Sequence, residues 1–297
     1  MLALPRYNRE VTHEMGQWKK YLIGEWNWMR PVKSIAFIYL ALLVVALGFA
    51  DQLIHRPPTA GYSEASHPVR SIEKSDGRKI ALIHLPAAPG MPTLLWSHGN
   101  AEDIGYLAER HQDFHARGYG ILAYDYPGYG LSEGRPDEDG CYDACQSAWN
   151  HLTETLGVPA DQIIIYGQSV GSGPSVWLAE HQSCAGLMLV TPFISAFRTV
   201  TRVPVFPGDR FNNIDRIASI TTPLLVVHGD QDQVIGQWHG KKLHDLHPGP
   251  KTFLSIEGAG HNDIYLLATD EILDALDVFW KTTRPGETDH QGLKPKS

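Results

Sequence analysis

Hydrophobic positions along this chain gather in apolar runs of two lengths. Residues 34–50, SIAFIYLALLVVALGFA, form one long run without a charge, close to the roughly 17 to 25 residues that a helix needs to cross a bilayer. Farther along, the runs are short and each is followed by turn residues. These short runs begin at Thr93, Gly120, Gln162, Leu187, Pro223 and Thr252. The pattern predicts one apolar helix followed by a domain built on buried strands.

The short apolar runs alternate with longer stretches that suit helices, such as residues 137–156. Continuous apolar runs are typical of strands buried on both faces, and the stretches between them are long enough for crossover helices. The sequence therefore predicts an α/β fold with a doubly wound, mostly parallel sheet in residues 67–283. In such a sheet the reactive groups gather at the carboxyl ends of the strands.

The long run, residues 34–50, is expected to be a single transmembrane helix. Its upstream flank, residues 1–33, is more basic than its downstream flank, where Arg56 is the first positive charge. The upstream positive charges nearest the run are Lys19, Lys20, Arg30 and Lys33. Lys and Arg are enriched in the cytoplasmic flank of a membrane-spanning helix. We therefore expect a cytoplasmic N-terminus and a folded domain on the other side of the membrane, in the periplasm.

Three other interpretations of the long run stay open. It suits a buried helix of the folded domain, or a peripheral helix in the membrane interface. It also suits the core of a cleaved signal, since Gly48 and Ala50 are small residues at a plausible cleavage spacing. We favour an uncleaved anchor because a 33-residue leader is long for a signal peptide.

Both flanks of the folded domain lack regular patterns. Residues 51–66 contain Pro57, Pro58 and Gly61, which break regular structure, and are expected to be a linker. Residues 284–297 are polar with two prolines and are expected to be a disordered tail.

Charge and chemistry-bearing residues exclude several classes of protein. The formal net charge is -8 and no long basic cluster is present, so nucleic acid is not an expected partner. The chain has 3 cysteines and no CxxC pair, which argues against a disulfide framework or a zinc site. His239, His244 and His247 offer no convincing ligand geometry, and the Gly-rich loop 125–134 lacks a Walker lysine. We expect no metal and no cofactor.

Ser169 lies in the sequence IIIYGQSVGSG, within a GxSxG frame that Gly167 and Gly171 complete. A strand is predicted before the serine and a helix after it, which is the context of a nucleophile elbow. The glycines let strand and helix approach without a Cβ clash, and the helix N-terminus favours negative charge near the serine. The pattern predicts that Ser169 is a nucleophile.

A serine nucleophile needs a base, and the base needs a carboxylate that orients it. His261, in a Gly-rich loop after the last predicted strand, fills the place of the base. Asp232 and Asp230 both follow the preceding strand and are rivals for the acid. Asp263 is expected to be a surface or capping residue.

An oxyanion hole of backbone amides is the third requirement. The amide of Val170, directly after the nucleophile, is one expected donor. The loop SHGNAED supplies the other, with the amide of Asn100 as first choice and that of Ala101 as the alternative. His98 in the same loop is expected to pack and to form hydrogen bonds there.

Six segments occur in the order and approximate spacing of one branch of the α/β-hydrolases: SHGNAED, YDYPGYGLSEGRP, IIYGQSVGSGPS, NIDRI, VVHGDQDQVI and EGAGHNDI. Over nearly all of residues 75–270 the chain resembles the membrane-associated, depalmitoylase-like α/β-hydrolase domain proteins and their bacterial relatives. The resemblance implies the α/β-hydrolase fold and, by matching motifs, catalytic roles for Ser169, Asp232 and His261. It also implies action on acyl esters and thioesters, with protein S-palmitoyl groups as the substrate of the animal members.

The chain departs from the animal members at its N-terminus. Those proteins attach through a lipidated cysteine-rich segment, whereas this chain has no cysteine before Cys141. A transmembrane helix would replace the lipid anchor, and a domain outside the cytoplasm would not reach cytoplasmic palmitoylated proteins. Residues 193–221 are short for a full cap domain, so we expect a minimal cap whose apolar residues either accept an acyl chain or pack the fold.

Together these features predict a membrane-anchored serine hydrolase that cleaves acyl esters or thioesters through a Ser-His-Asp triad and an acyl-enzyme. Its expected partners are the membrane and an acylated or small-molecule substrate. Two alternatives remain: a serine peptidase of the same fold, and a non-catalytic, membrane-bound binding module.

Overall fold

The computed structural model describes residues 28–63, 65 and 69–283. The predicted tail, residues 284–297, and most of the predicted cytoplasmic segment, with Lys19 and Lys20, lie outside this part of the chain. The predicted limits of the domains therefore stay a prediction.

The apolar run forms one helix, α2 (Arg30–Ile54), which begins before and ends after the predicted span. The helix up to Gly48 belongs to a first compact unit, residues 1–48, and its last residues, from Phe49, belong to a second unit, residues 49–297. Its most apolar window has a mean hydropathy of 2.3, and 0% of that window is buried. By length and composition the helix suits membrane association.

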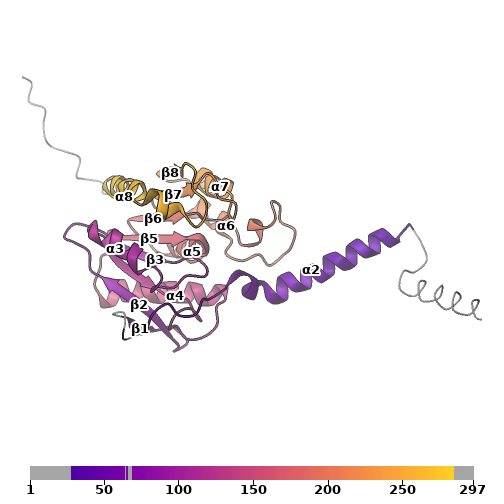
Figure 1. The fold of residues 1–297 in the computed structure, drawn as a ribbon, viewed down its shortest axis with the longest axis horizontal. Coiled ribbons are helices and arrows are strands. Elements are labelled where there is room, and N and C mark those ends of the chain that lie inside the picture. Colours follow the sequence, from indigo (N-terminus) through magenta and orange to yellow (C-terminus); the bar gives the residue numbers. More distant parts are fainter. Residues whose placement is uncertain (1–27, 64, 66–68, 284–297) are drawn as a thin grey trace, which may run out of the picture. The chain divides into compact units, whose positions relative to one another are not determined.

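An eight-stranded sheet, with the order β1-β2-β4-β3-β5-β6-β7-β8, forms the centre of the second unit (Figure 1). Neighbouring strands from β3 to β8 run parallel, whereas β2 pairs antiparallel with both β1 and β4. The strands are β1 (Arg70–Glu73), β2 (Lys79–Leu85), β3 (Thr93–Ser97), β4 (Gly120–Tyr124), β5 (Ile163–Gln168), β6 (Gly186–Val190), β7 (Leu224–Gly229) and β8 (Lys251–Ile256). All six predicted runs form strands, so the mostly parallel sheet is confirmed; β1 and β2 were not predicted.

Helices cover both faces of this sheet (Figure 1). They are α3 (Ala108–Ala116), α4 (Glu138–Asn150), α5 (Ser172–His181), α6 (Asn213–Arg216), α7 (Trp238–Leu246) and α8 (Ile264–Thr283). Side chains alternate between the faces of each strand, so Leu95 and Ile165 pack with α4 and α5, whereas Trp96 and Tyr166 pack with α3 and α8. This double covering explains why the strands read as continuous apolar runs.

The segment between β6 and β7 is short. It contains two helical turns, η4 (Phe197–Thr199) and η5 (Ile217–Ser219), together with α6. The exposed fractions of Val200 and Val203 are 88% and 62%. The expected minimal cap is confirmed.

The residues directly after α2 belong to the second unit and pack against the rest of it. We call Ile54 to Tyr62 the post-helix segment; after Ile54 it contains no helix or strand. His55 and Tyr62 within it are nevertheless buried. An irregular segment that is rich in proline thus contributes to the folded core.

The three cysteines are free thiols, and two of them, Cys141 and Cys145, are buried on α4. Burial raises the pKa of Cys145 and of Cys184 to about 12 and raises the pKa of Cys141 as well. These side chains are packing residues at neutral pH.

Candidate active site

Ser169 follows β5 directly and opens a short turn, η3 (Ser169–Gly171), that leads into α5. Its φ is +51°, in the left-handed region that residues with a Cβ rarely adopt. A Cβ at Gly167 would lie 2.6 Å from the carbonyl oxygen of Gly171, and one at Gly171 would collide with the carbonyl oxygen of Ser97. The GxSxG frame is therefore a steric condition of this tight turn.

His261 connects Ser169 with Asp232. Its Nε2 lies 3.0 Å from Ser169 Oγ, and its Nδ1 lies 2.7 Å from Asp232 Oδ2. Asp232 follows β7, and His261 lies between β8 and α8, so all three residues come from the carboxyl ends of parallel strands. With the Nδ1 hydrogen directed at the carboxylate, Nε2 is the acceptor that faces the serine hydroxyl.

The carboxylate of Asp232 is buried and well held. Its Oδ1 accepts hydrogen bonds from the amides of Val234 at 2.9 Å and Ile235 at 2.8 Å. Burial alone would raise the pKa of Asp232, but the contacts with His228 and His261 outweigh it and hold the pKa well below its usual value. Asp232 is therefore ionised at neutral pH.

The two other aspartates considered from the sequence have different partners. Asp230 is exposed, and its Oδ1 accepts a hydrogen bond from the amide of Gly258 at 2.8 Å. Asp263 is exposed and accepts one from the amide of Gly260 at 2.7 Å, which suits the expected surface position. Of the two rivals for the acid, the structure places Asp232 against His261.

Sequence reasoning missed His228, which is fully buried at the end of β7. Its Nε2 lies 2.7 Å from the carbonyl oxygen of Ile235, to which it donates, and 3.4 Å from Asp232 Oδ2. The hydrogen on Nε2, which carries a partial positive charge, thus also lies near the carboxylate of Asp232. The signal for it was present in VVHGDQD, where the histidine precedes Asp232 by four residues.

One expected oxyanion donor directly follows the serine, and the loop that carries the other lies beside it. Val170 follows it in η3, and a Cβ at Gly99 would lie 3.8 Å from Ser169 Cβ, so the loop after β3 borders the nucleophile. We call residues 98–103 the oxyanion loop. The amide of Ala101 already donates to Asn100 Oδ1 at 3.0 Å, which favours the amide of Asn100 over that of Ala101 as the second donor.

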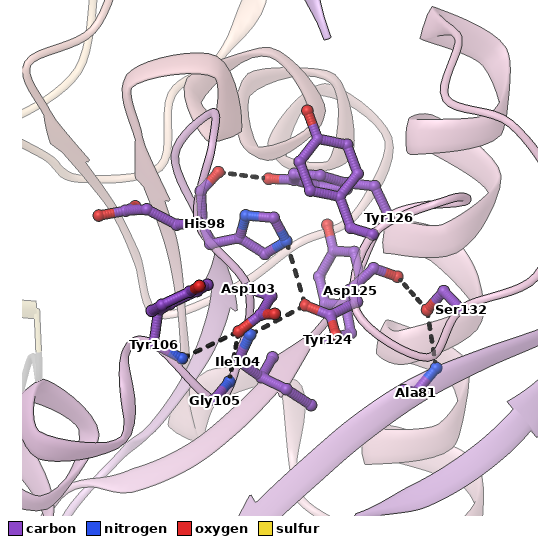
Figure 2. Close-up of polar contacts among 12 residues, drawn as sticks. Ala81, His98, Asp103, Ile104, Gly105, Tyr106, Tyr124, Asp125, Tyr126 and Ser132 are labelled. Carbon is purple, nitrogen blue, oxygen red and sulfur yellow. Dashed lines mark hydrogen bonds and ion pairs between the residues drawn. The ribbon is translucent and has the colours of Figure 1, made fainter. Parts of the chain in front are cut away.

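A buried network of hydrogen bonds holds the oxyanion loop in place. Figure 2 shows this network around His98 and Asp125. His98 Nδ1 lies 2.7 Å from the carbonyl oxygen of Gly99, and its Nε2 lies 3.4 Å from Asp125 Oδ1. Burial would lower the pKa of His98, but Asp125 outweighs burial and the pKa is raised. Asp125 also accepts a hydrogen bond from the amide of Ile104 at 2.9 Å. The predicted packing and hydrogen-bonding role of His98 is confirmed.

In the part of the chain that the structure describes, no group of three or more His, Cys, Asp or Glu side chains is arranged to hold a metal ion. His239 Nδ1 accepts a hydrogen bond from the amide of Ile194 at 3.2 Å, and burial lowers the pKa of His239 to about 4. His244 lies beside Asp245. His239 and His244 thus have different partners.

Comparison with known sequences finds related proteins. The family described as "Serine aminopeptidase, S33" matches residues 91–206, less than half of the chain. Human alpha/beta hydrolase domain-containing protein 17B is 37% identical over 222 residues, which cover 72% of this chain and 77% of the human protein. Protein 17C from Xenopus laevis is 39% identical over 197 residues, which cover 65% of this chain and 63% of the frog protein. The chain therefore spans less than two thirds of the frog relative.

Solved structures with a similar fold are more distant in sequence. An esterase from Pyrococcus furiosus has a TM-score of 0.64 at 16% identity, with 77% of this chain and 99% of the esterase covered. An alpha/beta hydrolase from Penicillium has a TM-score of 0.59 at 17% identity, with 72% and 98% covered. At these identities the likeness shows the fold alone, and the predicted fold is confirmed.

Proposed function

Because this chain belongs to the family of the alpha/beta hydrolase domain-containing 17 proteins, we propose that it is a membrane-associated serine hydrolase that cleaves acyl esters or thioesters. The observation that carries the proposal is the hydrogen-bonded series from Asp232 through His261 to Ser169. Esterases among the structural neighbours agree with this chemistry.

In the proposed reaction, Ser169 Oγ attacks the carbonyl carbon of the ester or thioester while His261 Nε2 takes its proton. His261 then gives that proton to the departing alcohol or thiol, which leaves an acyl group on Ser169. A water molecule, deprotonated by His261, releases the acid and restores the serine. Asp232 orients the imidazole and stabilises its charged form throughout.

The negative oxygen that forms during both attacks needs preorganised donors. We assign this role to the backbone amides of Val170 and Asn100, each worth a few kcal/mol to the transition state. Val170 follows Ser169 directly, and the loop that carries Asn100 borders the serine at Gly99. The proposed mechanism uses no cofactor.

The test is hydrolysis of p-nitrophenyl esters and acyl thioesters from short to long chain. We expect Ser169→Ala to lower turnover at least about 10³-fold with the fold retained. Ser219→Ala is the matched control, because Ser219 is exposed and donates to the carbonyl oxygen of Arg216 in a surface turn at 2.7 Å. Near-normal turnover in Ser169→Ala would contradict the assignment, and failure to label the wild type with a fluorophosphonate would favour a binding module.

A second candidate, a serine peptidase, is favoured by the description of the family that matches residues 91–206. The same triad suits amide cleavage. Release of N-terminal residues from peptides, without turnover of any ester, would favour this candidate over the acyl hydrolase.

We also propose that α2 anchors the chain as a single membrane span, with a cytoplasmic N-terminus and a periplasmic catalytic domain. The length of the helix and the basic residues before it support this orientation. In spheroplasts, added protease should digest the catalytic domain. A domain that is cut only after lysis would contradict the orientation.

A further inference from the structure

The side chain of Asn100 joins the oxyanion loop to the residues that follow α2. Its Nδ2 donates to the carbonyl oxygen of Ile54 at 2.7 Å. Its Oδ1 accepts from the amide of Arg56 at 2.9 Å and from the hydroxyl of Tyr129 at 2.8 Å. Both polar atoms of the Asn100 side chain are thus held, and two of its four partners, which include the amide of Ala101, are backbone groups of the post-helix segment.

The far end of the post-helix segment is fixed as well. The amide of Gly61 donates to Asp103 Oδ2 at 2.6 Å, and the hydroxyl of Tyr62 donates to Asp125. A Cβ at Gly105 would lie 2.6 Å from Tyr62 Cβ, so the two backbones are closely packed there. Because Asn100 and Asp103 belong to the same loop, the segment is attached to the oxyanion loop at two points.

We propose that the post-helix segment positions the backbone amide of Asn100 and thereby completes the oxyanion hole, an inference that rests on the hydrolase function proposed above. An oxyanion donor must stay within about 2.7–3.1 Å of the developing charge. The side-chain hydrogen bonds of Asn100 limit the movement of its backbone amide. They can do so only if the partner groups are themselves held in place. Ile54 and Arg56 are therefore positioning residues, and the end of α2 takes part in catalysis as well as in attachment.

His55 fastens this segment. Its exposed fraction is 4%, and its ring packs edge-on against Tyr129 and Phe211, with centroid distances of 6.3 and 5.8 Å. Within the described chain neither ring nitrogen has a hydrogen-bond partner, and burial lowers the pKa of His55 to about 4. The imidazole is thus a neutral packing ring at pH 7, and we expect phenylalanine to replace it.

The test compares His55→Ala with His55→Phe in the full chain in detergent micelles. His55→Ala should lower kcat roughly 10-fold while KM for a p-nitrophenyl ester changes less than about two-fold. It should weaken binding of an alkyl trifluoromethyl ketone, which forms a tetrahedral adduct with a catalytic serine, by a similar factor. His55→Phe should restore both quantities, because the edge-on packing is retained.

A second pair of variants tests the link to Asn100 with less risk to folding. Tyr129→Phe removes one hydroxyl that donates to Asn100. Tyr119→Phe is the matched control, because it removes a hydroxyl that donates to Asp277 at 2.6 Å, in α8. We expect kcat to fall about three- to ten-fold in Tyr129→Phe and to stay unchanged in Tyr119→Phe, even if both lower the unfolding temperature.

Three outcomes overturn the inference: a folded His55→Ala with kcat within about two-fold of wild type, a change in KM instead of kcat, or equal losses in Tyr129→Phe and Tyr119→Phe. If His55→Ala does not fold, the tyrosine pair decides. Failure of the proposed function has a different signature, since wild-type turnover would then not depend on Ser169. Ser169-dependent turnover with no effect of either test pair overturns the positioning role alone.

Discussion

Replacing Ser169 by glycine and, separately, by alanine measures the backbone strain at the nucleophile elbow. Both changes remove Oγ and its contact with His261, and they differ in how well the new residue accepts a φ of +51°. The left-handed region costs a residue with a Cβ about 1–2 kcal/mol, whereas glycine loses about 0.5–1 kcal/mol more chain entropy on folding. We expect Ser169→Gly to be the more stable variant by up to about 1 kcal/mol.

Ser172, three residues farther along, is the matched control. Its φ of -63° and ψ of -27° are helical, so alanine fits this position without backbone strain. The glycine and alanine variants then differ only in the entropy that glycine loses on folding. Ser172→Gly should therefore be less stable than Ser172→Ala by about 1 kcal/mol. Both variants lose the hydroxyl that donates to the carbonyl oxygen of Ser169 at 2.7 Å, and this loss cancels in the comparison.

The assay is thermal unfolding of the four full-length variants in the same detergent. The two differences have opposite signs and together amount to about 2 kcal/mol, or roughly 4–8 °C in unfolding temperature for a domain of this size. If the glycine and alanine variants have the same order of unfolding temperatures at both positions, the backbone at Ser169 is not strained.

Three further changes test the surroundings of the site. Asp232→Asn should lower ester kcat about 10⁴-fold, because an amide cannot hold His261 in the correct tautomer; an equal loss in Asp230→Asn would contradict the choice of acid. His228→Leu should lower the free energy of unfolding by about 2 kcal/mol in denaturant titrations, because a charged group loses a partner; His228→Gln keeps a donor and should lose less, and equal losses would count against the contact. His55 has a folded pKa of about 4, below its usual 6.5, so the unfolded state binds a proton first and wild-type stability falls as pH drops from 6.5 to 4. Unfolding curves over that range should show His55→Phe gaining up to about 3 kcal/mol relative to wild type, and a constant difference would contradict the burial of a neutral ring.

The places of Ser169 and His261 at strand ends were predictable because the conditions for them are local. A tight turn between a strand and a helix forces glycine at positions 167 and 171, and that steric condition is visible as letters in the sequence. The acid was less certain, since Asp230 and Asp232 follow the same strand. The choice between them depends on contacts with residues far along the chain. The amide of Gly258 donates a hydrogen bond to Asp230, whereas His261 contacts Asp232.

Other features were not predictable from local patterns. Strand β1 is four residues long and mostly exposed, so it lacks the apolar run that marks the parallel strands. His228 reads as one polar residue in an apolar strand, and its contact with Asp232 arises only when the loop after β7 folds back. Pro57 and Pro58 correctly indicate irregular backbone, but irregular backbone says nothing about packing. The contacts of Asn100 with Ile54 and Arg56 join positions more than 40 residues apart.

The burial of the thiols has a consequence for their reactivity. An oxidising compartment attacks cysteines through their thiolate form. With the pKa of Cys145 and of Cys184 at about 12, roughly one such group in 10⁵ is ionised at pH 7, and Cys141 and Cys145 are also shielded from solvent. The fold thus keeps its thiols unreactive at neutral pH by burying them, without pairing them in disulfides.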